Sequence, residues 1–199
     1  MSKSLLAIIG VVGAIVAYAI STYNGFIPLD ENVKKAWGNV EASYQKRFDL
    51  VPNLVETVKA YAKHEKGTFE AVTQARANAT KAIQINIDDM DEEEMQKKLK
   101  QINEANAQLN QGLGRLMATA EAYPELKANT NFIKLQEDLE KIENEIANAR
   151  RIFNEAVQTY NTEVRVFPAN IVANIFGFRS KAMFEAEAGA DKAVKVNFD

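Results

Sequence analysis

The sequence predicts an all-α protein in which an apolar helix at the N-terminus leads into an elongated antiparallel helical bundle. No charged residue occurs between Lys3 and Asp30, and residues 5–20 are apolar throughout. After Asp30, apolar residues recur every three or four positions among charged and amide residues, which is the period of a helix that buries one face. The 199 residues include only four prolines and nine glycines, too few for the closely spaced turns of a sheet protein.

Residues 5–23 are predicted to form a membrane anchor that contacts the lipid bilayer. A helix needs about 20 residues to cross a hydrocarbon core of roughly 30 Å, and the uncharged residues 21–23 extend the apolar run to that length. A cleaved signal peptide is the alternative, because Lys3 supplies a positive start and residues 17–19 resemble a cleavage site; cleavage there would remove residues 1–19. The chain has no cysteine, which excludes a lipid-modified cysteine.

The charges that flank the anchor bear on its orientation. Lys3 is the positive charge closest to the apolar run, whereas Lys34 and Lys35 on the other flank follow Asp30 and Glu31. Positive residues favour the cytoplasmic side of a membrane. We therefore expect a single-pass protein of a bacterial inner or plasma membrane, with a slight balance in favour of an extracytoplasmic body.

Composition argues against several function classes. The net charge is -3 and the two signs are interleaved, so the basic stripe of a nucleic-acid-binding surface is missing. No cysteine nucleophile, serine triad signature or phosphate-binding glycine loop is recognisable. A di-metal carboxylate bundle needs two Glu-x-x-His pairs, and His64 is the only histidine. The sequence therefore predicts a non-enzymatic protein without catalytic residues, cofactors or metal ligands.

These patterns divide the chain into three parts. Residues 1–29 form the anchor and a linker, residues 30–178 have the length of one domain, and residues 179–199 form a tail. Within the second part the helices are elongated, and their stripes provide enough apolar area for independent stability.

The first apolar stripe starts at Val33 and alternates spacings of four and three residues, a heptad seam typical of coiled coils, in which Arg47 is a charged exception. The stripe continues weakly beyond Glu65. It predicts one helix from about residue 30 to residue 85, on the order of 80 Å long. Pro52 should kink this helix, because its ring removes one backbone donor.

Two further stripes predict two more long helices. The second runs from Met95 to Tyr123 and is interrupted by Asn106, and the third runs without interruption from Phe132 to Tyr160. The acidic run at residues 88–94 is interpreted as a cap and first helical turn; a divalent-cation site is the alternative.

The ends of the predicted bundle are marked by proline and glycine. Short connections near Ile87 and Pro124 predict that consecutive helices are antiparallel. Pro168 can open a short fourth helix and Gly177 can close it. Residues 179–199 are interpreted as a mobile terminus or as an extended segment docked on a neighbour.

Some residues allow a structural and a functional interpretation. Arg47 is expected to have an acidic partner on a facing helix, because a buried guanidinium is costly without one; an anion or lipid-headgroup contact is the alternative. His64 and Glu65 are interpreted as structural or surface residues rather than metal ligands. Gly112-Leu113-Gly114 is interpreted as a close-packing point between helices rather than a phosphate loop.

Short motifs along the chain resemble those of the LemA family. They comprise Tyr23-Asn24, Ala36-Trp37, residues 47–55, residues 61–65 and Ala75-Arg76 in the first half, and residues 123–129, Phe153-Asn154, Tyr160-Asn161, Phe167-Pro168 and residues 176–178 in the second. The chain departs from the family pattern at Lys46-Arg47 and Val51, where the family commonly has a second basic residue and isoleucine, and at Phe153, where tyrosine is frequent. These substitutions are conservative. The family-motif positions for which we expect a structural role are Trp37, Arg47, Asp49, Pro52, Asn53, His64, Glu65, Arg76, Pro124, Asn129, Arg150, Asn154, Tyr160, Asn161, Phe167, Pro168 and Gly177.

The resemblance implies a bacterial single-pass membrane protein with a long helical-hairpin body and no established catalytic residues. Some LemA-like proteins are associated with magnetosome membranes, which points to membrane organisation, although a shared fold does not by itself fix function.

Three function hypotheses follow. The first is a membrane-tethered scaffold that self-associates into a homo-oligomer or holds another membrane protein. The second is an adaptor for a membrane protease or its substrates, with residues 179–199 as the contact. The third is an enzyme with an unrecognised carboxylate site.

Overall fold

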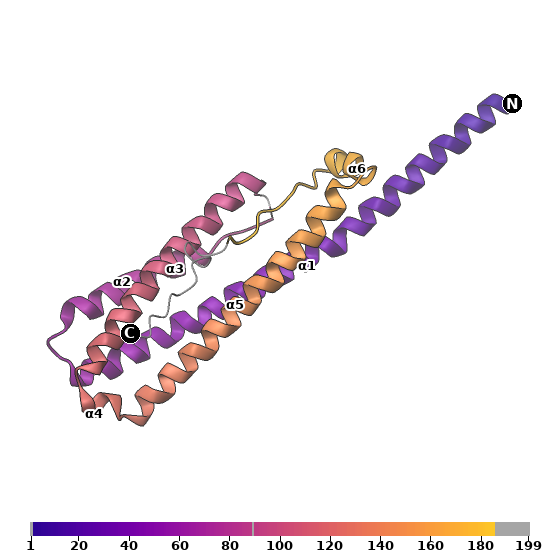
Figure 1. Cartoon of the computed structure of the whole chain (residues 1–199). Coiled ribbons are helices and arrows are strands. Elements are labelled where there is room, and N and C mark those ends of the chain that lie inside the picture. The colour runs from indigo at the N-terminus through magenta and orange to yellow at the C-terminus, as the bar shows by residue number, and fades with distance from the viewer. Residues whose placement is uncertain (1, 89, 186–199) are drawn as a thin grey trace, which may run out of the picture.

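The computed structural model describes residues 2–88 and 90–185, and the described part contains helices and no strand. The helices are α1 Lys3–Tyr61, α2 Lys66–Ile83, α3 Glu92–Glu121, α4 Pro124–Lys127, α5 Thr130–Arg165 and α6 Ala169–Phe176. In Figure 1 the first turns of α1 project beyond the rest of the molecule, and the other helices run back and forth along its second half. The predicted all-α class, with an apolar N-terminal helix followed by an antiparallel bundle, is confirmed.

Helix α1 has two halves of opposite character. Its 59 residues continue without interruption through Pro28 and Pro52. The apolar side chains from Leu5 to Ile20 are exposed except for the half-buried Ala19, whereas buried positions begin at Phe26 and recur to the end of the helix. One continuous helix therefore joins the apolar segment to the body.

The chain reverses at residues 62–65, where the sequence had predicted a continuous helix to residue 85. That prediction is wrong: α1 ends at Tyr61 and α2 begins at Lys66. The large apolar residues of the seam stop at Val58, since Tyr61 is exposed and Glu65 is only half-buried. Folding back lets the apolar face of α2 pack against α3, whereas a straight continuation would carry it away from the bundle.

The bundle core forms between two helix pairs, α1 with α5 and α2 with α3. The α1 seam supplies most of the central side chains, and the stripes predicted for α3 and α5 are largely buried against it. The short connections predicted near Ile87 and Pro124 are present, the second as α4. The seam is therefore used within the chain.

Several helices begin or end at the residues that the sequence analysis predicted. Asp91 caps α3 by accepting a hydrogen bond from the Glu94 amide at 2.8 Å, so the acidic run acts as cap and first turn. Pro168 precedes α6, and Gly177 ends it with φ 80°, a left-handed conformation that favours glycine. These boundaries agree with the prediction.

Gly112 lies where α3 approaches α2 closely. A Cβ built on Gly112 would lie 3.3 Å from Val72 Cγ2, whereas one on Gly114 would meet nothing within 4 Å. The predicted close-packing role therefore holds for Gly112 and not for Gly114.

We expect Gly112→Val to lower the free energy of unfolding by about 1–2 kcal/mol, because the added methyl groups overpack the α2–α3 contact. Gly114→Ala is the matched control and should raise it by up to about 1 kcal/mol, because alanine favours the helix. Urea denaturation followed by far-UV circular dichroism measures both. Equal effects of the same sign would contradict the assignment.

Candidate functional site

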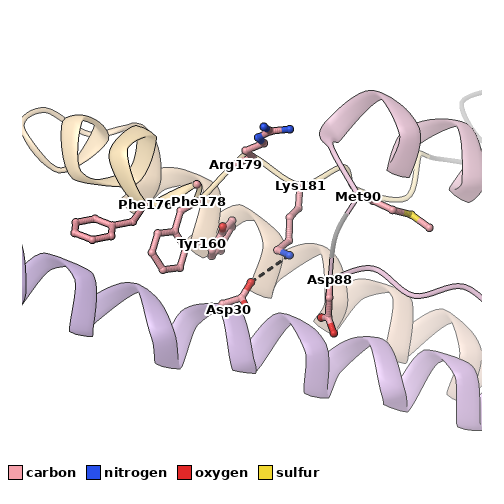
Figure 2. A pocket seen from close by; sticks show the side chains of 9 residues that line it. Asp30, Asp88, Met90, Tyr160, Phe176, Phe178, Arg179 and Lys181 are labelled. Carbon is pink, nitrogen blue, oxygen red and sulfur yellow. Dashed lines mark ion pairs between the residues drawn. The ribbon is translucent and has the colours of Figure 1, made fainter.

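A polar hollow lies where α1 leaves the bundle, between α1, the end of α5 and the chain after α6 (Figure 2). Its volume is ≈ 380 Å³. The residues that line it are Asp30, Asp88, Met90, Tyr160, Phe176, Gly177, Phe178, Arg179 and Lys181. Its lining includes charged side chains of both signs close to the apolar segment.

The two carboxylates of the hollow, Asp30 and Asp88, are paired with lysines. Lys181 is only 6% exposed, and its Nζ lies 3.1 Å from Asp30 Oδ1. Lys34 Nζ lies 3.0 Å from Asp30 Oδ2 and 3.4 Å from Asp88 Oδ1. The hydrogen bond to Asp30 holds the pKa of Lys34 above its ordinary value, and burial together with the Asp30 carboxylate raises the pKa of Tyr160 to about 12.

The paired charges stabilise the fold of this protein and leave few groups that could react with a substrate. The Tyr160 phenol stays protonated at neutral pH, so it is no general base. Lys34 stays protonated because its hydrogen bond to Asp30 raises its pKa. Among the described residues no group of three histidine, cysteine, aspartate or glutamate side chains is placed to hold a metal ion. We therefore interpret the hollow as a junction that fixes the tail to α1.

Two asparagines of α5 hold the tail. The Asn161 amide donates to the Lys181 carbonyl and accepts from the Lys181 N–H, both at 2.8 Å. Asn154 makes the same pair of bonds with Phe184, both at 2.9 Å. Seven helical residues rise about 10.5 Å and three extended residues about 10 Å, so the spacing of the two asparagines matches that of their partners. Residues 179–185 thus dock on the chain's own α5, and the rest of the predicted tail lies outside the described residues.

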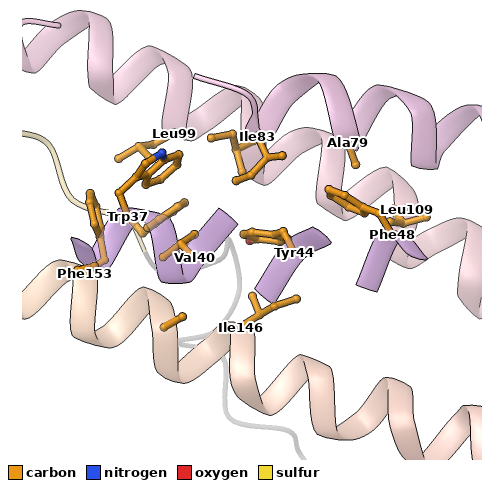
Figure 3. Close-up of a cluster of buried hydrophobic side chains, with 14 of the residues drawn as sticks. Trp37, Val40, Tyr44, Phe48, Ala79, Ile83, Leu99, Leu109, Ile146 and Phe153 are labelled. Carbon is orange, nitrogen blue, oxygen red and sulfur yellow. The ribbon is translucent and has the colours of Figure 1, made fainter. Parts of the chain in front are cut away.

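An aromatic cluster completes the docking of the tail. Phe184 stacks on Trp37 of α1 with ring centroids 6.1 Å apart and meets Phe153 of α5 edge-on at 5.7 Å. Arg150 covers the other side, with its guanidinium carbon 4.5 Å from the centre of the Phe184 ring. Figure 3 shows Trp37 and Phe153 in the core, next to the α1 side chains that fill the space between α5 and the α2–α3 pair.

Arg47 has the acidic partner that the sequence predicted. The side chain is 1% exposed, its Nε lies 2.9 Å from Glu143 Oε1 on α5, and it donates to the side-chain oxygen of Asn110 on α3. The charge therefore links three helices across the core.

We expect Arg47→Met to change the free energy of unfolding by less than about 1 kcal/mol, because an apolar side chain of similar length replaces a charge that is costly to bury. Glu143→Gln should cost about 2 kcal/mol, since it removes the negative charge that pairs with the buried guanidinium. Glu145→Gln is the control. Glu145 pairs with the exposed Lys46 at 2.7 Å, and its loss should cost less than about 0.5 kcal/mol. A large loss in Arg47→Met would instead indicate a required ion pair.

Arg76 compensates for Pro52. Proline has no N–H, so it leaves the carbonyl of the residue four positions earlier without its helical donor. That residue is Phe48, and Arg76 Nε of α2 donates to the Phe48 carbonyl. This contact explains why α1 tolerates Pro52 in its buried half.

The remaining family-motif residues are structural or exposed. Asn129 caps α5 by accepting from the Asn131 and Phe132 amides, and it donates to the Tyr61 hydroxyl at the end of α1. Pro124 opens α4. Five more complete the set: Asp49, Asn53 and His64 are exposed, Glu65 precedes α2 as its cap residue, and Phe167 is exposed beside α6.

Sequence reasoning missed the pairing of the half-buried Asp30 with the buried Lys181. Asp30 is the first charge after the apolar segment, and a carboxylate so close to apolar helix surface needs a cation; this was the available signal. No pattern around Lys181 indicates its partner.

The architecture defines the class of protein. It is a helical bundle whose first helix is long and apolar enough to cross a membrane by length and composition, with the apolar window entirely unburied. Residues 36–198 match the LemA family, and the chain belongs to that family.

The relatives include magnetosome proteins. The chain is 27% identical to magnetosome protein MamQ 2 of Paramagnetospirillum magneticum, over 96% of this chain and 74% of that protein. It is 26% identical to magnetosome protein MamQ of Magnetospirillum gryphiswaldense, over 91% of this chain and 71% of that one. Protein LemA of Metamycoplasma hominis is 23% identical over 79% of this chain and 66% of its own length.

Proposed function

We propose that the protein is a membrane-anchored, non-enzymatic scaffold that self-associates in the bilayer and holds its bundle at a fixed angle to the membrane. The observation that carries the proposal is the continuity of α1. Its first half is apolar and exposed, and its second half is part of the core. A helix without a break transmits the orientation of the anchor to the body. The magnetosome names of two relatives support a role at membranes.

Self-association would use the bare half of α1. The seam of the body is consumed by the core, so pairing through the seam is disfavoured. The anchor instead carries small residues at heptad-like spacing on one face, and these are Ala7, Gly10, Ala14, Ala17 and Ser21, all exposed. Small residues let two helix backbones approach closely in lipid, and a Cβ on Gly10 would meet nothing within 4 Å.

The adaptor hypothesis loses part of its basis. The backbone of Lys181 and Phe184 is hydrogen-bonded to the side chains of Asn161 and Asn154 on α5, and Phe184 is buried. That part of the tail is not free to take up a protease or a substrate.

Disulfide cross-linking in membranes tests the scaffold proposal, because the chain has no native cysteine. In a symmetric dimer of parallel helices, equivalent residues face each other at the interface. Ala17→Cys, on the small-residue face, should give a cross-linked dimer upon oxidation. Val12→Cys, on the opposite face of the helix, should give little. Monomer alone from both variants, or equal cross-linking of both, would contradict specific self-association.

A further inference from the structure

We propose that α6 is a second membrane-embedded element, which lies against the anchor in the half of the bilayer next to the body and exposes its apolar face to lipid acyl chains. The inference depends on the anchor of the proposed function and adds a second lipid contact to it. It concerns residues 166–178, which the motifs mark only at their ends.

The composition of this segment is that of a membrane element. Residues 166–178 carry no charge and are bounded by Arg165 and Arg179. The side chains of Phe167, Ile171 and Ile175 are 76%, 51% and 71% exposed. Ile171 and Ile175 are four residues apart and so lie on one face of α6, and Phe167 lies in the turn that precedes the helix. A cluster of large apolar side chains that is open to water is unusual on a soluble body.

The position of α6 places that face beside the anchor. One apolar groove is lined by Val11, Ala14, Ile15, Tyr18 and Ala19 of α1 together with Pro168, Ile171, Val172 and Ile175. A second groove is lined by Val16, Ala19, Ile20 and Tyr23 together with Phe176. The rings of Tyr23 and Phe176 meet edge-on, 5.0 Å between centroids. In Figure 1, α6 lies beside α1 where that helix leaves the bundle.

The length of the anchor indicates that α6 lies in lipid and not in water. Residues 5–23 rise about 28 Å, which just matches a hydrocarbon core of roughly 30 Å. The two grooves that α6 and Pro168 form with the anchor extend over residues 11–23, about 18 Å of that length. If α6 stayed in water, only residues 5–10 would remain for the bilayer, about 9 Å, and the anchor could not span it. A membrane that contains the anchor therefore also contains the exposed face of α6.

The other side of α6 faces the polar body. Asn170 and Asn174, one helical turn apart, line a separate hollow with Arg165, Ser180 and the first turn of α3. Arg165 Nη2 lies 3.3 Å from Glu92 Oε2 there. The helix is thus amphipathic, as an element at a membrane boundary requires. Its polar side meets the bundle, and its apolar side is left for acyl chains.

Depth-dependent quenching tests the inference in the full chain. Single-cysteine variants Ile175→Cys and Asn174→Cys carry an environment-sensitive fluorophore on the apolar and polar sides of α6. Ile9→Cys serves as the reference inside the anchor, and Lys63→Cys as the reference at the far end of the body. The protein is placed in phosphatidylcholine vesicles with or without nitroxide-bearing phospholipid, and circular dichroism checks that each variant keeps its helix content.

We expect blue-shifted emission and strong lipid quenching for Ile9→Cys and Ile175→Cys, and weak quenching for Asn174→Cys and Lys63→Cys. If Ile9→Cys is quenched but Ile175→Cys behaves like Lys63→Cys, the inference on α6 is overturned and the anchor stands. Blue-shifted emission at Ile175→Cys without lipid quenching would mean that a second copy covers the face, which also overturns the inference. If Ile9→Cys is not quenched, the anchor fails, and with it both proposals.

Discussion

Replacing Trp37 by alanine is expected to lower the free energy of unfolding by about 4 kcal/mol, the range for truncating a large buried aromatic residue. Trp37 is buried, and its ring meets Phe153 edge-on at 5.4 Å and stacks on Phe184. Aromatic pairs of this kind contribute about 0.5–1.5 kcal/mol each beyond the area that they bury. Urea denaturation in detergent, followed by far-UV circular dichroism, gives the value.

Ile152→Ala is the control for this prediction. Ile152 precedes Phe153 on α5 and is exposed, so its truncation should cost less than about 1 kcal/mol. A loss of similar size in both variants would show that the aromatic cluster has no special weight.

The same cluster offers a direct probe of the tail, because Trp37 is the only tryptophan. Phe184→Ala removes the ring that covers it, so water should reach the indole and its emission should shift to the red. A variant with unchanged Trp37 emission would mean that the tail does not cover the indole in solution.

The helices that were predicted correctly from the sequence are those with a periodic apolar stripe or with clear end residues. The stripes of α3 and α5 and the Pro168–Gly177 limits of α6 are local patterns, and the structure agrees with them. The acidic partner of Arg47 also followed, because desolvation of a buried guanidinium demands one wherever it lies.

The chain reversal at residues 62–65 and the docking of the tail did not follow, and both depend on tertiary packing. The spacing of apolar residues carries on from α1 to α2 almost in register, so periodicity alone cannot distinguish one long helix from a hairpin. Tail docking depends on Asn154 and Asn161, whose spacing matters only once an extended segment lies beside them. In a single sequence, two asparagines seven residues apart on a helix give no such signal.

Asp30→Asn is expected to lower the free energy of unfolding by about 3 kcal/mol, because it leaves the buried Lys181 ammonium without an opposite charge. Lys181→Met should cost less, because Asp30 keeps Lys34 at 3.0 Å and methionine keeps the apolar stem of the lysine. The two single variants are therefore unequal although they break the same ion pair.

The double variant Asp30→Asn/Lys181→Met separates this account from a general loss of packing. With no buried charge left unpaired, it should be more stable than Asp30→Asn alone and close to Lys181→Met. Glu31→Gln is the matched control on the same turn of α1. Glu31 is exposed and pairs only at the surface with Lys34 at 3.2 Å, so its loss should cost less than about 0.5 kcal/mol. If the losses of the two single variants simply add in the double, Asp30 and Lys181 are not coupled, and the hollow does not hold the tail to α1.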